Sequence, residues 1–422
     1  MSEPSAQTLD SNITKNVIYN KLWDKTLAVA ETSNVSVNQL LVNRLTLSNF
    51  RCYKQQRIEV DGRPVLLTGP NGAGKTNLLE ALSFLIPGRG LRRAKLRDVG
   101  RRSPEGSMLA TQWGVSAELL VGDHNLEIGT GYQYADKLNN SSNGSRDKRV
   151  TKVNGTILKN QAELGQYTSV QWLTPQMDRL FIEGASGRRR FLDQIVCGLD
   201  PGHASPTAAY EHSLRNRNKL LQEGTQDLNW LNSIEGSIAR HGVAISVRRL
   251  EAIERLQVVC GHNNGSFPGS LIKMVGEVEN WLLAEPALVV EDRLQAALRN
   301  SRKKDTNSGF TSVGPHRSDF MVCHGETGME AALCSTGEQK SLLIGIILAI
   351  AKLQTEQRGF TPLLLLDEIT AHLDEPRRAS LFQLIIEMGA QAWITGTERD
   401  LFNLFNGQAQ HLSIEKGGLI GE

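Results

Sequence analysis

The sequence has few cysteines, no long apolar run and almost no net charge. Its five cysteines are scattered among 422 residues and never occur as C-x-x-C, which argues against a disulfide framework or a zinc site and is typical of a cytoplasmic protein with reduced thiols. No stretch reaches the roughly 18 consecutive apolar residues of a membrane-spanning helix. The formal net charge of +2 at pH 7 argues against a uniformly basic surface that coats nucleic acid.

Residues 1–40 also lack the features of a targeting segment. They are rich in Ser, Asn, Thr and Ala, contain no arginine and have no apolar core of the signal-peptide kind. We expect either a disordered extension or residues upstream of the true start.

A phosphate-binding loop follows the apolar segment 65–68 and precedes an apolar helical pattern. The loop has the form G-x-x-x-x-G-K-T, in which glycines let backbone N–H groups face an anion and the next helix adds its positive end. Lys75 is expected to reach the β and γ phosphates of ATP, and Thr76 to ligate Mg²⁺. The residues expected to hold the nucleotide are Gly69, Pro70, Asn71, Gly72, Ala73, Gly74, Lys75 and Thr76.

A second apolar strand ends in two acids, Asp367 and Glu368, after four consecutive leucines. Carboxyl ends of parallel strands meet at one edge of a sheet, so these carboxylates are expected beside the phosphates. We expect Asp367 to hold Mg²⁺ through water and Glu368 to polarise the attacking water. An ordinary core strand with solvated acids is the alternative, and the phosphate loop disfavours it.

A small-residue loop, Ser335-Thr336-Gly337-Glu338-Gln339-Lys340, opens a long apolar helix and is a further helix N-terminus suited to phosphate. The order of these motifs, with a trailing Leu373-Asp374, resembles the head of ABC-class ATPases. The resemblance implies that two heads enclose two ATP molecules. It also implies that Ser335 and Gly337 of one head meet the nucleotide of the other, with Ser335 catalytic, and that Asp374 lies along that interface.

The same resemblance extends to two positions near the nucleotide. Gln176 follows the predicted strand 168–173, where ABC heads carry a glutamine that joins Mg²⁺ and couples the nucleotide to a helical arm. Arg51 ends an L-x-N-F-R segment that resembles the chromosome-maintenance and repair branch, which implies a place near the phosphates; an exposed edge arginine is the alternative. Thr395-Gly396-Thr397 stands where many ABC proteins have a histidine, which predicts slow turnover.

Seven cations crowd into residues 89–102, where Asp98 is the only acid. Such a run could neutralise several DNA phosphates and give salt-dependent affinity; a solvated surface loop is the alternative. The cations are Arg89, Arg92, Arg93, Lys95, Arg97, Arg101 and Arg102.

Two motifs narrow the resemblance to the RecF family: G-x-x-x-R-R-x-F-L-D at 184–193 and G-P-H-R-S-D at 314–319. The resemblance covers nearly everything after residue 40. It implies recombinational repair and replication, an ATP-dependent homodimer on double-stranded or gapped DNA, and RecR and RecO partners that help place recombinase. Arg188 and Arg189 either contact DNA or tie the helical arm to the core. A nucleotide-gated scaffold with little hydrolysis and a transporter ATPase subunit are the rival functions.

The predicted fold is α/β, an ABC-type P-loop ATPase head with an inserted, mainly helical lobe. Residues 41–175 and 311–422 are expected to build the nucleotide core, and residues 176–310 the helical lobe. The roughly 160 residues between Gln176 and Ser335 hold no sustained heptads, which argues against a long coiled-coil arm. Asn154-Gly155 between apolar residues predicts a type I′ hairpin.

Overall fold

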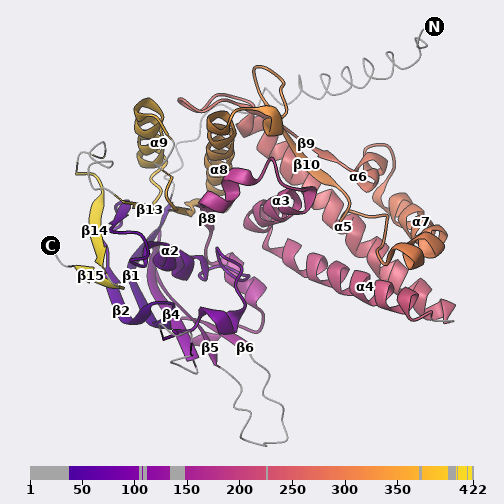
Figure 1. Ribbon diagram of the computed structural model, residues 1–422, viewed down its shortest axis with the longest axis horizontal. Coiled ribbons are helices and arrows are strands. Elements are labelled where there is room, and N and C mark those ends of the chain that lie inside the picture. Colours follow the sequence, from indigo (N-terminus) through magenta and orange to yellow (C-terminus); the bar gives the residue numbers. More distant parts are fainter. Residues whose placement is uncertain are drawn as a thin grey trace, which may run out of the picture. The chain divides into compact units, whose positions relative to one another are not determined.

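Figure 1 shows a computed structural model of the chain. It describes residues 38–103, 107, 112–133, 148–224, 227–369, 373–397, 405, 407–415 and 417–420. The predicted extension therefore lies outside the described residues except at its end, because the first strand already begins at Asn38.

The described chain contains fifteen strands and eight α-helices. The strands are β1 (Asn38–Phe50), β2 (Tyr53–Glu59), β3 (Val65–Thr68), β4 (Gln112–Val121), β5 (His124–Gln133), β6 (Lys148–Val153), β7 (Thr156–Ile157), β8 (Val170–Leu173), β9 (Ser270–Val275), β10 (Asp319–His324), β11 (Phe360–Thr361), β12 (Leu363–Leu366), β13 (Ala392–Gly396), β14 (Gln410–Glu415) and β15 (Gly418–Ile420). The helices are α2 (Lys75–Ser83), α3 (Ala185–Leu199), α4 (Ala204–Gln222), α5 (Leu228–Cys260), α6 (Glu277–Leu282), α7 (Ala287–Ser308), α8 (Thr336–Arg358) and α9 (Glu375–Glu387).

A six-stranded sheet of order β15-β14-β3-β13-β12-β8 carries the predicted motifs, and all its pairings except β14–β15 are parallel. Strand β12 is apolar on both faces because each face meets a different core. Leu363 and Leu365 pack with α2 and the antiparallel sheet, whereas Leu364 and Leu366 pack with α8 and α9. The alternation follows from the two-residue period of a strand. Four consecutive leucines thus mark a strand buried on both sides.

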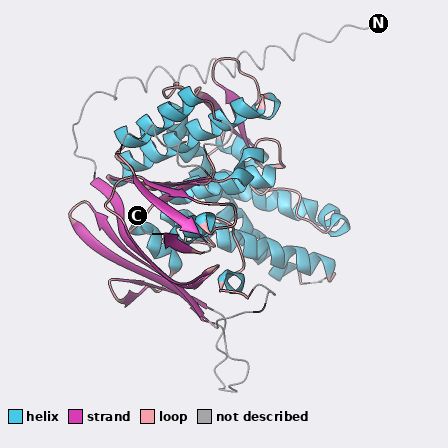
Figure 2. Ribbon diagram, turned by 60° about the vertical axis from the view of Figure 1, so that its left-hand side comes forward, coloured by secondary structure: helices cyan, strands magenta, loops and turns pink. Residues whose placement is uncertain are grey.

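The second large sheet is mainly antiparallel, of order β11-β1-β4-β5-β6-β7 with β2 on β1. Figure 2 shows these strands gathered on one side of the described chain and the long helices on the other. Strands β1 and β2 pair antiparallel, with Leu45 opposite Ile58. The hairpin prediction is also confirmed, since Asn154 and Gly155 both have positive φ, 47° and 78°.

The helical part is packed into two different cores. The C-terminal end of α5, with Leu256 fully buried, shares a core with α3, α8 and the parallel sheet. The N-terminal end of α5, with Ile238 and Val243, packs instead with α4 and α7 in a separate distal core. A two-stranded ribbon, β9 with β10, lies within this region. The division at residues 175/176 and 310/311 therefore stays a prediction, because the central core draws on both sides of each boundary.

The helix that follows the phosphate loop ends about one turn before Pro87. Helix α2 ends at Ser83, where the Phe84 N–H turns to the Ala81 carbonyl. The apolar residues that follow are buried as an irregular segment that leads to the cation run.

Candidate nucleotide site

The phosphate loop joins β3 to α2, as its sequence predicts, and its glycines are placed where side chains would not fit. Gly69 has φ 143° and a Cβ there would collide with the Ile414 carbonyl oxygen. Gly74 has φ 117°, and a Cβ would lie 2.7 Å from the hydroxyl of Tyr53. Gly72 has φ 80° and faces open space. Helix α2 has no side-chain N-cap, so its first N–H groups are directed at the loop's anion position.

The side chain of Lys75 folds back against the backbone of the phosphate loop. Its side chain is buried, and Nζ donates to the carbonyl oxygens of Gly69 (2.5 Å) and Pro70 (3.1 Å). Burial lowers the pKa of Lys75, although the nearby carboxylates of Glu368 and Asp367 act in the opposite direction. The ammonium group is thus held at the phosphate position by backbone carbonyls that a phosphate oxygen can replace.

Asp367 follows β12 directly, and its carboxylate is fixed by two hydroxyl groups from different strands and helices. Thr76 Oγ1 donates to Asp367 Oδ1 at 2.9 Å, and Thr395 Oγ1 donates to the same oxygen at 2.8 Å. The Asp367 N–H donates to the Leu173 carbonyl oxygen at 2.9 Å, which continues the β8–β12 pairing. Two of the three residues predicted to hold the metal, Thr76 and Asp367, are therefore in direct contact although they lie 291 positions apart.

Glu368 is exposed beside this cluster and has an unusual backbone. Its φ is 50°, in the left-handed region that a residue with a Cβ enters at a cost of about 1 kcal/mol. The Glu368 N–H donates to Thr395 Oγ1 at 2.8 Å, which holds that conformation. The hydroxyl of Thr395 is consequently engaged on both sides. It positions the acid pair and does not stand free as a substitute for a phosphate-sensing histidine.

These residues fit ATP and Mg²⁺. Magnesium prefers oxygen ligands and is commonly held by one or two carboxylates together with substrate phosphates. The Thr76 hydroxyl and Asp367 carboxylate supply such oxygens at the N-terminus of α2, beside the Lys75 ammonium group. No cluster of three or more His, Cys, Asp or Glu side chains suited to a metal occurs elsewhere in the described ranges.

Ser335 lies at a different helix N-terminus, that of α8, where it forms a capping box with Glu338. The Ser335 N–H donates to Glu338 Oε2 at 2.8 Å, and the Glu338 N–H donates to Ser335 Oγ at 3.3 Å. The Ser335 hydroxyl also donates to Glu338 Oε2 at 2.7 Å, and this bond, together with the one from the Ser335 N–H, lowers the pKa of Glu338. Ser335 is exposed, and across the described residues no hydrogen bond or ion pair connects it or Gly337 with residues 69–76. Ser335 is therefore accessible to a second molecule.

Comparison with known proteins agrees with this geometry. The family model described as RecF/RecN/SMC N terminal domain matches residues 41–417. The DNA replication and repair proteins RecF of Mesorhizobium japonicum and Agrobacterium fabrum are each 43% identical to this chain, over 90% of it and over 97% and 99% of their own lengths. The chain belongs to the RecF family.

The fold of this RecF-family chain also matches solved structures. Two structures of the recombination mediator protein RecF, described as RecF-ATPrS and RecF-ATP, superpose with TM-scores of 0.76 and 0.75. They are 24% and 23% identical to the chain, over 92% of it and 99% of theirs. The predicted α/β ABC-type head is thereby confirmed. Within the described residues, no helix is long and apolar enough to cross a membrane.

Gln176 and Asp374 each follow a strand of the parallel sheet, β8 and β12 respectively. Gln176 lies in the 3-10 helix Pro175–Arg179, just after β8, and is exposed near the carboxyl edge where Asp367 emerges. Asp374 is the N-cap of α9 and accepts a hydrogen bond from the Arg377 N–H at 3.0 Å. The intervening positions 370–372 lie outside the described residues. Contact of either side chain with nucleotide stays a prediction.

Arg51 is held away from solvent by an acid that the sequence analysis missed. Its guanidinium donates to both carboxylate oxygens of Glu80, at 2.8 and 2.5 Å, and to the Asp98 carbonyl oxygen at 2.9 Å. Glu80 is fully buried in α2 and also accepts from Arg92 at 3.2 Å. The exposed-edge alternative is therefore wrong, and Arg51 braces the helix that follows the phosphate loop. A single acid inside an apolar helical pattern was the signal available.

The cations of residues 89–102 differ in whether neighbouring side chains engage them. Arg92 also donates to Asn77 at 2.7 Å, and Arg102 pairs with Asp98 at 2.7 Å. The exposed members are Arg89, Arg92, Arg93, Lys95, Arg97 and Arg102. Lys95 is exposed without a described ion pair, which keeps it available to a polyanion.

Arg188 and Arg189 are engaged within the protein. Arg188 pairs with both oxygens of Asp319, at 2.8 and 2.7 Å, and also donates to the Glu183 carbonyl oxygen. The Asp319 contact raises the pKa of Arg188. Arg189 donates to the Ser318 carbonyl oxygen at 2.7 Å. Both contacts join α3 to the start of β10, which lies in the same helical region, so DNA contact and a tie to the core both stay predictions for these arginines.

Proposed function

We propose that this chain is an ATP-dependent, DNA-binding ATPase of recombinational repair and replication. Family membership and the relatives named DNA replication and repair protein RecF support the broad role. The same membership argues against a transporter subunit. The observation that carries the ATPase activity is the cluster in which Thr76 and Thr395 fix the Asp367 carboxylate beside an exposed Glu368.

Each residue of that cluster has a role in the proposed reaction. Bound Mg²⁺ would neutralise phosphate charge and orient the β and γ phosphates. Thr76 and Asp367, with Gln176 at the same edge, would hold the metal, and Lys75 would bind the phosphates. Glu368 would accept a hydrogen bond from the attacking water and orient it. Because Thr395 replaces a histidine and is already engaged, we propose slow turnover that DNA stimulates.

The proposal includes a homodimer that ATP stabilises. Ser335 is exposed and Gly337 is half-buried at the N-terminus of α8, where a phosphate held by a second protomer would meet the positive end of the helix. Asp374 would lie along the same interface. If ATP contacts are complete only across two protomers, ATP must favour the dimer by linkage. Hydrolysis would then open the dimer and release DNA.

The proposed DNA partners are double-stranded and gapped DNA, contacted by the exposed cations of residues 89–102. RecR and RecO proteins are the proposed protein partners, and the proposed outcome is the placing of recombinase on single strands. The proposed location is the cytoplasm, in association with the nucleoid. These partners follow from the family and from no contact within the chain.

The test compares binding of a gapped duplex with and without ATP at several salt concentrations. Glu368→Gln keeps the shape of the acid but weakens water activation, so it should trap an ATP-dependent, salt-sensitive complex. Lys75→Met removes the phosphate contact and should neither dimerise nor retain DNA when ATP is added. Equal DNA binding with and without ATP would refute an ATP-stabilised dimer that holds DNA, and would favour a protein scaffold. Retention of DNA by Lys75→Met as by the parent would refute the ATP linkage.

A further inference from the structure

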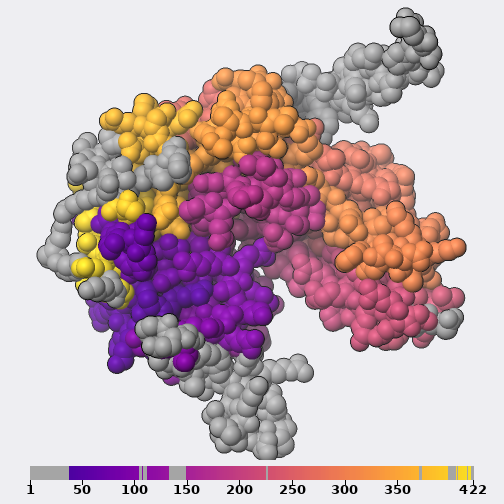
Figure 3. All heavy atoms as spheres, in the orientation of Figure 1, coloured from indigo at the N-terminus to yellow at the C-terminus, as the bar shows by residue number. Residues whose placement is uncertain are grey.

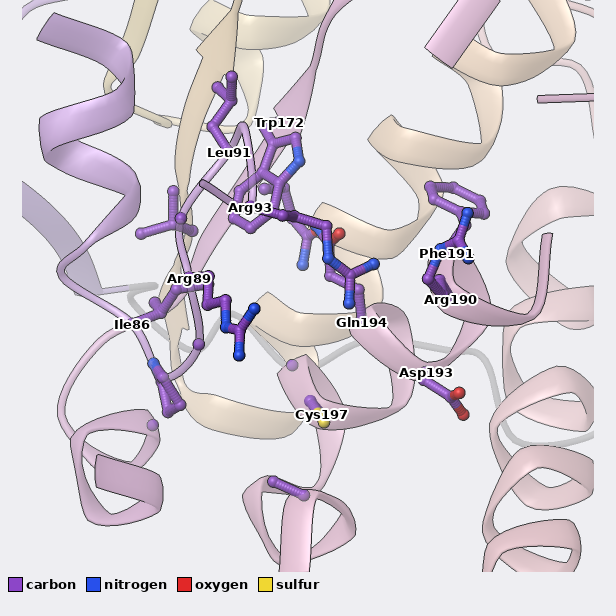
Figure 4. Close-up of a pocket in the computed structure, with 18 of the residues that line it drawn as sticks. Ile86, Arg89, Leu91, Arg93, Trp172, Arg190, Phe191, Asp193, Gln194 and Cys197 are labelled. Carbon is purple, nitrogen blue, oxygen red and sulfur yellow. The ribbon is translucent and has the colours of Figure 1, made fainter. Parts of the chain in front are cut away.

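A cavity of about 690 Å³ lies between the segment that follows α2 and helices α3 and α4. Its lining comes from three stretches, residues 86–93, 165–183 and 187–211, together with Arg358. Figure 3 shows the surface hollowed where the purple segment meets the magenta one, and Figure 4 shows the lining side chains. None of residues 69–76 lines it, so it is distinct from the phosphate loop, although Gln176 contributes to its wall.

Three arginines line this cavity without a partner of their own. Arg89 and Arg93 reach from the loop after α2 towards α3, which carries Arg190 (Figure 4). Within the described ranges no hydrogen bond or ion pair engages any of the three guanidinium groups. By contrast the fourth lining arginine, Arg358, donates to the carbonyl oxygens of Thr168 and Gly165 and is structural. We call the cavity with Arg89, Arg93 and Arg190 the arginine cleft.

The acids that line the arginine cleft are each engaged with other cations. Asp193 accepts from both Nε and Nη2 of Arg249 at 2.8 Å and from His203 Nε2 at 3.0 Å. These contacts outweigh the effect of burial and lower the pKa of Asp193 to about 2. The two remaining acids have looser partners: Glu183 lies 3.7 Å from Arg179, and Glu211 lies 3.8 Å from Arg215. The uncompensated charge in the cleft is therefore positive.

The backbone at Arg93 is held in a costly conformation that keeps this charge in the cleft. Its φ is 52°, in the left-handed region, and its N–H donates to the Gly90 carbonyl oxygen at 3.2 Å. Burial lowers the pKa of Arg93, and the neighbouring charges of Arg190 and Arg89 act in the same direction, whereas Glu211 and Asp193 act in the opposite one. Several positive charges therefore lie near one another, and a bound anion would reduce the repulsion between them.

Buried polar atoms in the same wall also lack partners. Gln171 is 2% exposed and lines the cavity, and its Oε1 has no hydrogen-bond donor among the described residues. The buried Nε2 of Gln194 likewise has no acceptor there. Trp172 and Phe191 add apolar surface beside them. The wall therefore combines guanidinium groups, unsatisfied amides and aromatic rings.

We propose that the arginine cleft binds a phosphate group, carried either by a small phosphorylated molecule or by the end of a nucleic-acid strand. Guanidinium groups bind phosphate oxygens bidentately, and three of them match a dianion better than a carboxylate. The volume suits a small ligand or a strand terminus and is within the usual range of ligand pockets. Arg89 and Arg93 also belong to the cations proposed to contact DNA; the site goes beyond that proposal because it adds Arg190 and requires neither ATP nor a second protomer.

The test uses a dye-labelled dinucleotide with a 5′-phosphate and its 5′-hydroxyl counterpart, with binding followed by anisotropy. All proteins carry Lys75→Ala, so that the phosphate loop contributes little. Arg190→Gln and Arg93→Gln should each weaken binding of the phosphorylated probe about tenfold or more. Arg299→Gln, an exposed arginine on α7 outside the cleft, should bind as the background protein does. Thermal unfolding should show that Arg190→Gln remains folded.

Competition then identifies the source of the phosphate. Displacement by inorganic pyrophosphate at similar concentration indicates a small phosphorylated ligand, whereas displacement by the phosphorylated dinucleotide alone indicates a strand terminus; either result supports the site. Equal binding of the 5′-hydroxyl probe, or unchanged binding by Arg190→Gln, overturns it. Arg190 is not among the cations proposed to contact duplex DNA, so the Arg190→Gln result tests the cleft separately from ATP-dependent duplex binding.

Discussion

The hydroxyl group of Thr395 can be removed almost without changing side-chain volume, because Thr395→Val replaces it by a methyl group. The substitution removes a hydrogen bond to the Asp367 carboxylate and leaves the Glu368 N–H without its acceptor. A hydrogen bond to a charged group contributes roughly 1.5–3 kcal/mol and an unsatisfied buried donor costs roughly 1–3 kcal/mol. We expect the free energy of unfolding to fall by about 3 kcal/mol.

The effect on hydrolysis should be larger than the effect on binding. Thr395 holds the left-handed backbone of Glu368, and a displacement of about 1 Å can reduce a rate about 100-fold. Single-turnover hydrolysis should therefore slow between 10-fold and 100-fold, by roughly the amount that a misplaced base costs, while ATP affinity changes little. Thr395→Ser keeps the hydroxyl and should retain most of the rate. Parent-like hydrolysis by Thr395→Val would refute the positioning role.

Three further predictions follow from buried or engaged charges. Glu80→Ala leaves two guanidinium groups without their buried carboxylate and should lower the free energy of unfolding by about 3 kcal/mol in urea titrations, and an unchanged midpoint would contradict this. Burial lowers the pKa of His316 to about 4, so the folded state favours the neutral ring; stability should decline as pH falls from about 6.5 towards 4, and His316→Gln, unlike exposed His212→Gln, should flatten that decline. Arg188→Gln should lower thermal stability and leave the salt slope of DNA binding unchanged, whereas Lys95→Gln should reduce that slope by about one and leave stability unchanged.

The tautomer of His316 follows from its contacts and supports the pH prediction. Its Nε2 lies 2.9 Å from the Thr311 carbonyl oxygen, which can only accept, so Nε2 carries the proton. Its Nδ1 then accepts from the Tyr210 hydroxyl at 2.7 Å. Protonation of Nδ1 would place two donors against each other unless the hydroxyl turned away.

Local patterns predicted the nucleotide site because its residues lie directly after the strands that position them. The glycines require positive φ where they stand, and the four leucines of β12 place Asp367 at the carboxyl edge whatever surrounds them. Strand pairing then brings Thr76 and Thr395 to the same oxygen. The spacing in sequence was sufficient because the parallel sheet has one edge at which such residues meet.

Features that depend on distant partners could not be predicted in this way. The bond between Arg188 and Asp319 joins residues 131 positions apart, and nothing local distinguishes an engaged arginine from a free one. The arginine cleft is assembled from three stretches, so its charge balance exists only in the folded chain. Strand β9 was missed because its six residues lie between helical patterns and gain their partner, β10, from far along the chain.

Helix α5 gives the chain a mechanical property. Its 33 residues make a rod about 50 Å long, with one end packed against α8 and the parallel sheet and the other end in the distal core. A rigid rod amplifies rotation into displacement, so a tilt of about 5° at the α8 end moves the far end by about 4 Å. A small rotation of α8, whose N-cap is Ser335, would therefore produce a larger displacement of the surface formed by α4 and α7.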